Sequence, residues 1–369
     1  MKFLKDFKLA FAFFVFLSIS CKEEKTTNPD LFDRTDFLKN MADGLIKPAY
    51  NQLLTESEKL NNLALTFVQN PDSIQLNELQ NSWTSAYSTW QKANAFNFGP
   101  AGEEGTRKSL LEEIAVFPVN EFKINSIVNG GSFNVNDFNR DARGFLAIEY
   151  LIFSSNGKQT SVLNSFSSPA KVAYLKVLTQ HVYDRIKVVS DAWNGSFREE
   201  FLNNNGTESG SSTSSFYNEF VKSFEALKNF KLGLPLGKRP GQTHVDANLL
   251  EARYSGKSLQ FLKLHIQNLN LIWNGKPFQS DVDGPGFKEY LDNVEGGKAL
   301  VISSESQMNN VIKAANEIPV NASLAEQLIR SPAPLENLHT ELQKQTRFFK
   351  SDMSSVLGIA ITYSSGDGD

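Results

Sequence analysis

Arg143-Gly-Phe-Leu-Ala-Ile-Glu-Tyr-Leu-Ile-Phe153 is an apolar run that contains one carboxylate, Glu149. As a helix, the run places Phe145, Ile148 and Ile152 at spacings of three and four, and other apolar residues cover most of the remaining circumference. We therefore expect a helix that protein encloses on most sides. A buried carboxylate is costly unless it meets a cation, several donors or a metal, or holds a proton. Glu149 is accordingly either a structural carboxylate bonded to an Arg or Tyr, or part of a ligand or metal site.

Helical periodicity extends over most of the chain. Residues 37–70 repeat apolar side chains every seven positions, and a helix that begins near Ser73, its expected cap, follows. Its aromatic stripe, which includes Trp83, Tyr87 and Trp90, is typical of a core. A central helix is expected over residues 137–154. The predicted fold class is therefore all-α.

Two irregular stretches interrupt the helices. Residues 116–128 contain a Pro and little helical periodicity, and residues 231–245 carry three Gly and two Pro. A low-complexity loop is expected over 201–215. The chain therefore divides into two similar halves, an N-terminal bundle over 36–200 and a C-terminal bundle over 216–369, as an internal duplication would leave them.

The N-terminus is typical of an exported lipoprotein. Within residues 1–20, three lysines flank or precede an apolar core that is too short to span a bilayer. Cys21, the only cysteine, follows a stretch that approximates a lipoprotein-processing site. We predict that acylated Cys21 anchors the chain in outer-membrane lipid and that residues 21–35 form a flexible tether. The alternative is an ordinary signal peptide with cleavage nearby.

Charge and cysteine content exclude some classes of protein. Lys and Arg total 37 against 41 Asp and Glu, and no basic segment is concentrated enough to indicate nucleic acid as a partner. A single cysteine cannot form an intramolecular disulfide. No segment after the signal reaches the roughly 20 apolar residues of a transmembrane helix. The lipid is thus the only membrane attachment that we expect.

Several motifs resemble one family. Gly144-Phe-Leu-Ala-Ile-Glu149 resembles the Gly-x-His-x-x-Glu signature of imelysin-like proteins, once classed among metallopeptidases, with Leu146 in place of the His. Other segments are similar to the family in its order: Trp83 with Trp90, Ala95-Phe-Asn-Phe-Gly-Pro100, Phe117-Pro-Val-Asn-Glu121, Arg253-Tyr-Ser-Gly-Lys-Ser258 and the closing residues 357–369. The resemblance implies paired four-helix bundles with a site where they meet, and an association with bacterial iron uptake.

Peptidase chemistry is disfavoured by the residues themselves. A His-x-x-Glu metallopeptidase needs imidazoles to hold zinc and a carboxylate to activate water, and Leu146 cannot bind a metal. His181 and His265 lie on amphipathic helices, where a solvent-facing or satisfied role is expected. His244 lies in a Gly-rich segment that could reach the interface between the halves. Glu149 and His244 are therefore the remaining metal candidates.

Duplication would bring the irregular segment before Glu149 face to face with the segment before Arg253. We predict a polar ligand site between them. Its residues are Glu149, Arg143 and Asn120 on one side, and Arg253, Tyr254 and Ser255 on the other.

These features indicate a lipid-anchored binding protein of the cell envelope, on the periplasmic face or the cell surface. It would capture or relay iron or an iron-containing ligand, with iron-uptake components as partners. Iron or another divalent metal is the candidate cofactor, which the sequence leaves open. A surface adhesion or scaffold lipoprotein is the alternative of a different class. A closed polar pocket between the halves would favour ligand binding, and a long exposed apolar patch would favour adhesion.

Overall fold

The computed structural model describes residues 32–104, 108–137, 140–153 and 158–363. The export signal, Cys21 and most of the tether lie outside these residues. Regular structure in the described residues is helical, and no strand is formed among them. The predicted all-α fold class is therefore confirmed. No described helix combines the length and apolarity that crossing a membrane requires.

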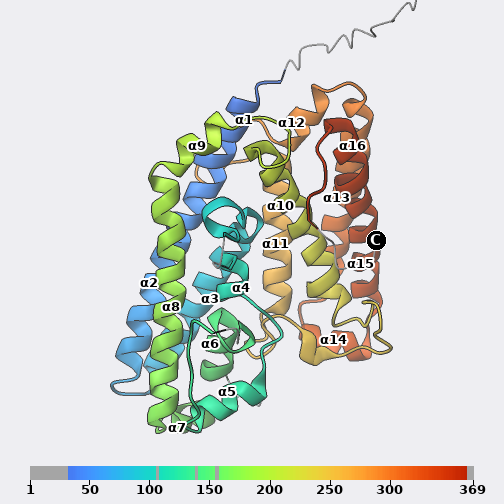
Figure 1. Cartoon of the computed structure of the whole chain (residues 1–369). Coiled ribbons are helices and arrows are strands. Elements are labelled where there is room, and N and C mark those ends of the chain that lie inside the picture. The colour runs from blue at the N-terminus through green and yellow to red at the C-terminus, as the bar shows by residue number, and fades with distance from the viewer. Residues whose placement is uncertain (1–31, 105–107, 138–139, 154–157, 364–369) are drawn as a thin grey trace, which may run out of the picture. The chain divides into compact units, whose positions relative to one another are not determined.

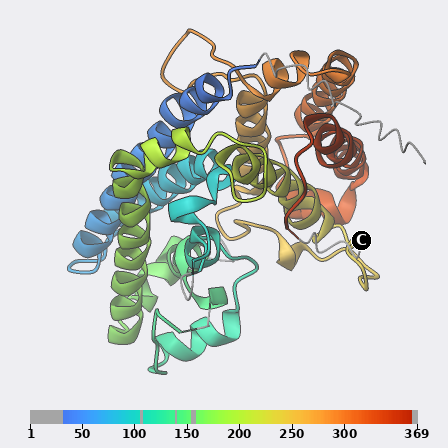
Figure 2. The same cartoon turned by 45° about the horizontal axis from the view of Figure 1, so that its top comes forward.

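The first half of the chain is built around the long helix of residues 47–67. Its helices are α1 (Arg34–Asn40), α2 (Lys47–Phe67), α3 (Ser73–Ala93), α4 (Leu110–Ile114), α5 (Glu121–Val128), α6 (Gly144–Ile152), α7 (Gln159–Ser165), α8 (Pro169–Asn194) and α9 (Phe197–Asn203). A π-helical turn, η1 (Met41–Ile46), joins α1 to α2. Helices α3 and α8 both pack along α2, and α6 packs against α8 (Figures 1 and 2).

The second half is also helical, with a long connection over residues 234–257 between two of its helices. Its elements are α10 (Ser212–Ala226), η5 (Leu227–Gly233), α11 (Ser258–Trp273), α12 (Phe287–Asp292), α13 (Gly297–Glu317), α14 (Leu324–Arg330), α15 (Ala333–Arg347), η7 (Phe348–Asp352) and α16 (Met353–Leu357). Helix α15 packs on α13, and α11 contacts both α13 and α3. Helices α3 and α11 therefore connect the two halves (Figure 1).

The buried apolar side chains form one continuous cluster. Trp83 and Tyr87 of α3 are fully buried, as predicted, and the Tyr87 ring meets Phe261 of α11 edge to face at 4.8 Å. Residues Leu31–Asp369 make one compact unit. The division of this unit into two four-helix bundles stays a prediction.

Some predicted boundaries are wrong in informative ways. Asp72, not Ser73, caps α3, since its carboxylate accepts the Gln75 amide at 2.8 Å. The central helix begins at Gly144 instead of residue 137, because a left-handed backbone at Gly144 separates it from the preceding turn. Part of the stretch predicted as irregular, residues 116–128, is the helix α5.

The low-complexity stretch is also more ordered than its composition indicates. Of residues 201–215, the first three belong to α9 and the last four to α10, which Ser211 caps by accepting the Ser214 amide at 3.3 Å. Residues 211–214 are buried. Small hydroxyl side chains allow this close packing while they supply the cap. The predicted tether likewise ends early, because α1 begins at Arg34.

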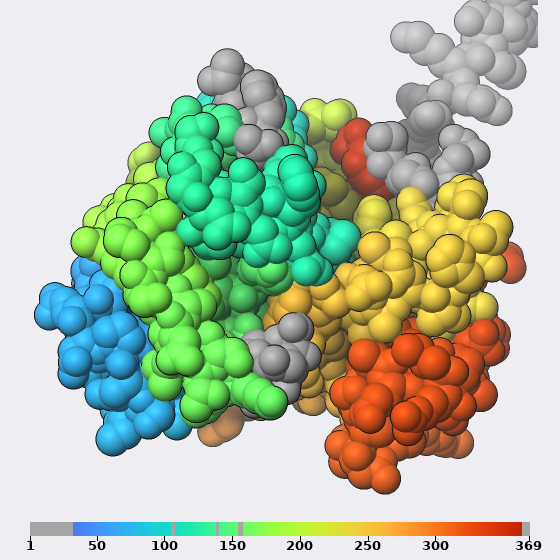
Figure 3. Space-filling model, turned by 90° about the horizontal axis from the view of Figure 1, so that it is seen from below, coloured from blue at the N-terminus to red at the C-terminus, as the bar shows by residue number. Residues whose placement is uncertain are grey.

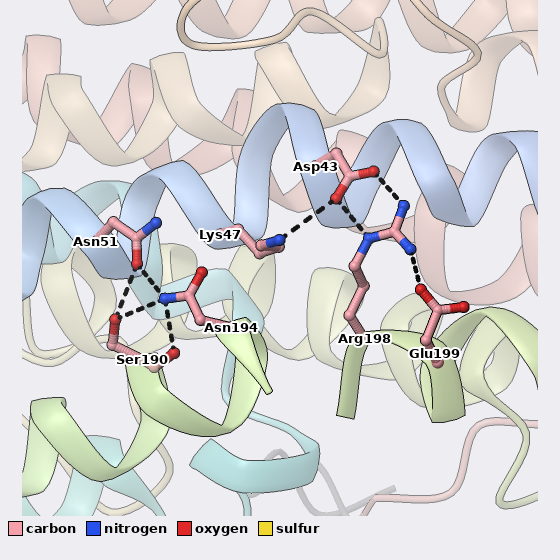
Figure 4. Close-up of polar contacts among 7 residues, drawn as sticks. All are labelled: Asp43, Lys47, Asn51, Ser190, Asn194, Arg198 and Glu199. Carbon is pink, nitrogen blue, oxygen red and sulfur yellow. Dashed lines mark hydrogen bonds and ion pairs between the residues drawn. The ribbon is translucent and has the colours of Figure 1, made fainter. Parts of the chain in front are cut away.

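Polar contacts join the α8–α9 corner to η1 and α2 (Figure 4). The Arg198 Nε donates to Asp43 at 2.7 Å. Asn51 accepts from the Ser190 hydroxyl at 2.9 Å and from the Asn194 amide at 2.6 Å. These contacts set the register in which α8 lies on α2, and α8 in turn supports the helix that carries Glu149.

Candidate functional site

Glu149 lies on α6, a nine-residue helix in which Tyr150 alone is not buried. Its side chain is 1% exposed. Helix α6 packs against α3, α4 and α8, as its nearly continuous apolar circumference predicts. The prediction of an enclosed helix with a buried carboxylate is confirmed.

Gly144 has a structural reason to be glycine. Its φ is +79°, in the left-handed region, and a Cβ at this position would lie 2.3 Å from the carbonyl oxygen of Ile114. Any other residue would combine backbone strain with a steric clash. The close approach of Gly144 to the end of α4 thereby fixes where α6 starts and where Glu149 points.

One carboxylate oxygen of Glu149 accepts the Ser255 backbone amide at 2.7 Å. The segment 253–255 therefore reaches Glu149 from the other half of the chain, as predicted. Burial raises the pKa of Glu149 to about 7, and the nearby charge of Glu251 acts in the same direction. The bond from Ser255 and the charge of Arg253 lower the pKa only partly in return. Glu149 can thus hold a proton near neutral pH.

Arg253 does not pair with Glu149, although both were predicted to belong to one polar site. Its guanidinium forms an ion pair with Glu121 and donates to Asn248 at 2.7 Å and to the Tyr254 hydroxyl at 2.6 Å. Arg253 pairs with Glu121 because the helix α5, which the sequence did not predict, begins at Glu121 and places that carboxylate beside Arg253.

Arg143 belongs to a different cluster. It is 3% exposed, pairs with Glu113 at 3.0 Å and donates to the Asp137 carbonyl at 3.0 Å. The other Glu113 oxygen lies 3.2 Å from Nε2 of His181. Burial acts to raise the pKa of Glu113, but His181 and Arg143 outweigh it and hold that pKa below its usual value. The structure therefore places Arg143 in a structural ion cluster rather than opposite segment 253–255.

Asn120 is a helix cap. Its side-chain oxygen accepts the Lys123 amide at 3.1 Å and its side-chain amide donates to Asp141 at 3.2 Å. It lines neither of the cavities described below. Asn120 was predicted to belong to the ligand site, but both ends of its side chain instead hold the first turn of α5.

The histidines are dispersed. His181 is buried with Nε2 at 3.2 Å from Glu113, and His265 is buried with Nε2 at 2.8 Å from the Ser223 hydroxyl, while its Nδ1 has no hydrogen-bond partner among the described residues. His244 is exposed and lines neither cavity. Among the residues described, no three His, Cys, Asp or Glu side chains are arranged to hold a metal ion.

Two cavities share Tyr254. The small one, about 10 Å³, is lined by Glu149, Leu146 and Arg253 among others and has room for about one water molecule. The large one, about 440 Å³, is lined by polar and aromatic side chains that include Tyr150, and its volume is in the range of small-molecule pockets. Figure 3 shows the face on which the segment near residue 125, in teal, meets the segment near residue 250, in yellow.

A buried polar network next to Glu149 was not predicted. The Lys231 ammonium lies 2.9 Å from Glu251 and donates to Gln91 at 2.5 Å, and the Tyr87 hydroxyl donates to Glu251 at 2.6 Å. Burial lowers the pKa of Lys231, although Glu251 opposes this shift. Glu251 lies two residues before Arg253, so the Arg253 motif could have indicated from the sequence that Glu251 lies near the site. Nothing in the sequence around Lys231 indicates a buried lysine.

The fold and the site define an all-helical protein in which a buried carboxylate on a short apolar helix meets a loop from the other half of the chain. The chain belongs to the imelysin family: the family model described as Imelysin matches residues 46–347. The predicted family is thereby confirmed. A search among curated proteins finds no match.

Two solved structures are similar to this chain. One, described as an iron-regulated protein A precursor from Parabacteroides distasonis, has a TM-score of 0.68 at 14% identity and covers 88% of this chain and 95% of its own. The other, an imelysin-like protein from Psychrobacter arcticum, has a TM-score of 0.68 at 17% identity and covers 89% of this chain and 97% of its own. At these identities the similarity is one of fold.

Proposed function

We propose that this chain is an imelysin-family binding protein of the cell envelope that captures or relays iron, or an iron-containing ligand, in the cavity bordered by Tyr150 and Tyr254. The observation that carries the proposal is the position of this cavity. It holds about 440 Å³ and adjoins the buried Glu149 through Tyr254, where α5 and α6 meet the segment that precedes α11. This pocket is open and polar, and its volume is in the range of small-molecule sites, which supports ligand binding.

Iron enters the proposal by analogy. One protein of similar fold is described as iron-regulated, which supports a link to iron without naming the bound species. The residues around Glu149 do not fit a resident metal ion. One Glu149 oxygen is occupied by the Ser255 amide, and the neighbouring walls are the apolar Leu146 and the cationic Arg253. Iron would therefore be cargo, carried within a ligand, and the same donor set disfavours peptidase chemistry.

The test uses the fragment 26–369, which contains the whole compact unit Leu31–Asp369. Thermal-shift and titration measurements with ferric citrate, ferrous iron, haem, zinc and calcium should give a rise in Tm for an iron species. Tyr254→Phe should reduce that rise, and Tyr183→Phe on α8 should leave it unchanged. The proposal fails if no iron species raises Tm, or if the rise is the same in Tyr254→Phe.

The location of the protein is part of the proposal. Acyl chains on Cys21 would hold the chain on outer-membrane lipid, on the periplasmic face or the cell surface, near iron-uptake components. In cell fractionation, full-length protein with Cys21→Ser should leave the membrane fraction. Retention of that variant on membranes would contradict acylation of Cys21 as the anchor.

A further inference from the structure

Lys171 is a partly buried cation beside the large cavity. It is the third residue of α8, and its side chain lines the cavity. Its ammonium donates to the Ser165 hydroxyl at 2.6 Å and lies 4.3 Å from the centre of the Phe166 ring. No Asp or Glu among the described residues forms an ion pair with it. An ammonium without a carboxylate partner at the wall of a cavity is available to pair with an anion.

The surroundings of Lys171 do not supply negative charge. Burial lowers the pKa of its ammonium to about 8, and no neighbouring carboxylate acts to raise that pKa. The N-terminus of α8, capped by Ser168, adds positive potential on the same side. Glu121 also lines the cavity, but its charge is paired with Arg253. The cavity therefore contains an uncompensated positive charge that an anion would neutralise.

The remaining walls indicate the shape of that anion. The Tyr150 and Tyr254 rings meet edge to face with centroids 5.0 Å apart, and both line the cavity. Leu151 and Val162 add apolar surface. An aromatic ring packs favourably on such walls, whereas a small inorganic anion would leave them in contact with water.

We propose that the large cavity binds a small aromatic carboxylate, whose carboxylate pairs with the Lys171 ammonium and whose ring packs on Tyr150 and Tyr254. This inference rests on the cavity of the proposed function and specifies the chemistry of the molecule that enters it. An aromatic carboxylate with further oxygen donors could also chelate iron, which would connect the two proposals.

Isothermal titration of the fragment 26–369 with benzoate, benzamide and inorganic phosphate tests the inference. Benzamide keeps the ring and loses the charge, so it should bind about tenfold or more weakly than benzoate, as expected for a charged hydrogen bond. Phosphate should also bind more weakly than benzoate. Lys171→Met should weaken benzoate binding about tenfold or more, Lys171→Arg should retain it, and Lys176→Met, at an exposed position of α8, should not change it.

The inference is overturned if benzoate does not bind, if benzamide or phosphate binds as tightly, or if Lys171→Met binds benzoate like the unmodified chain. Circular dichroism of each variant confirms that a loss of binding is not a loss of fold. Failure of this inference is distinguishable from failure of the proposed function. If iron species raise Tm but benzoate does not bind, the aromatic carboxylate ligand is ruled out and the proposed function is not. If benzoate binds but no iron species raises Tm, the link to iron is ruled out and the carboxylate site is not.

Discussion

Glu149 carries its charge at a cost, because α6 removes the carboxyl group from water and the loop from the other half offers it one backbone donor, that of Ser255. Arg253, the nearest candidate counter-charge from the sequence, is instead paired with Glu121. The chemistry of this residue is therefore set by burial more than by any charged partner. A carboxyl group that titrates near neutral pH can accept or donate a hydrogen bond to whatever enters the small cavity.

The raised pKa of Glu149 has a consequence for stability. Its pKa rises from the usual 4.5 to about 7 on folding. Between these values the folded chain holds a proton that the unfolded chain has lost, so the free energy of unfolding should fall as pH rises through this range. The loss should reach about 3 kcal/mol above pH 7. Glu149→Gln cannot titrate, and its unfolding free energy relative to the unmodified chain should increase by that amount from about pH 4.5 to pH 7. Urea denaturation at both pH values measures this, and a constant difference would rule the mechanism out.

At the scale of elements, α5 is the helix that sequence periodicity failed to indicate. Pro118 lies just before it and its eight residues span little more than two turns, which is too short for a clear apolar repeat. The signal that was present is local: Asn120 is a favoured N-cap residue, and Glu121 in the first turn suits the helix dipole. Since Glu121 also draws Arg253 away from Glu149, this short helix decides the polar contacts of the site.

Asn120 should affect stability and not ligand binding. Asn120→Ala removes the cap of α5 and the bond to Asp141, and should lower the free energy of unfolding by about 1 kcal/mol. Asn120→Ser keeps a capping oxygen and should lose less. Urea denaturation compares the two variants, with benzoate titration as the second readout. Equal losses in both variants, or weakened benzoate binding in either, would contradict the role of Asn120 as a cap.

At the scale of the whole molecule, the two halves meet through both apolar and charged groups. Helices α3 and α11 supply the aromatic contact between Tyr87 and Phe261. Next to it, Lys231 of η5 pairs with Glu251, and both side chains are buried. A buried ion pair costs desolvation on both sides, so its removal in two steps should not be additive.

The expected non-additivity can be tested by mutating Lys231 and Glu251 singly and together. Glu251→Gln leaves the Lys231 ammonium buried without its counter-charge, and should lower the free energy of unfolding by about 3 to 5 kcal/mol. Adding Lys231→Met removes that charge and should restore more than half of the loss, since the side-chain amide oxygen that Glu251→Gln introduces can still accept from Tyr87. A double-mutant cycle by urea denaturation gives the coupling. A double variant as unstable as the sum of the two single variants would show that the pair is not coupled.

Much of the architecture follows from local pattern. The spacing of Trp83, Tyr87 and Trp90 predicts the buried face of α3, and the apolar run around Glu149 predicts a buried carboxylate. The segment 253–255 was rightly predicted to lie near Glu149, and that prediction came from the expected equivalence of the two halves. These features could be predicted because helix formation and burial depend on residues within a few turns of one another.

The partner of each charge was decided only by the tertiary structure. Arg143 pairs with Glu113 and Arg253 with Glu121, while Lys171 lies beside the cavity without a carboxylate partner among the described residues. Each outcome depends on how helices far apart in the sequence rotate and pack, and a change of one helical position moves a side chain by about 100° around its axis. By itself the sequence determined the long helices and the faces they bury, but not the short helix α5. The packing of those helices determined which polar groups meet, because ion pairs act over a few ångströms that no periodicity specifies.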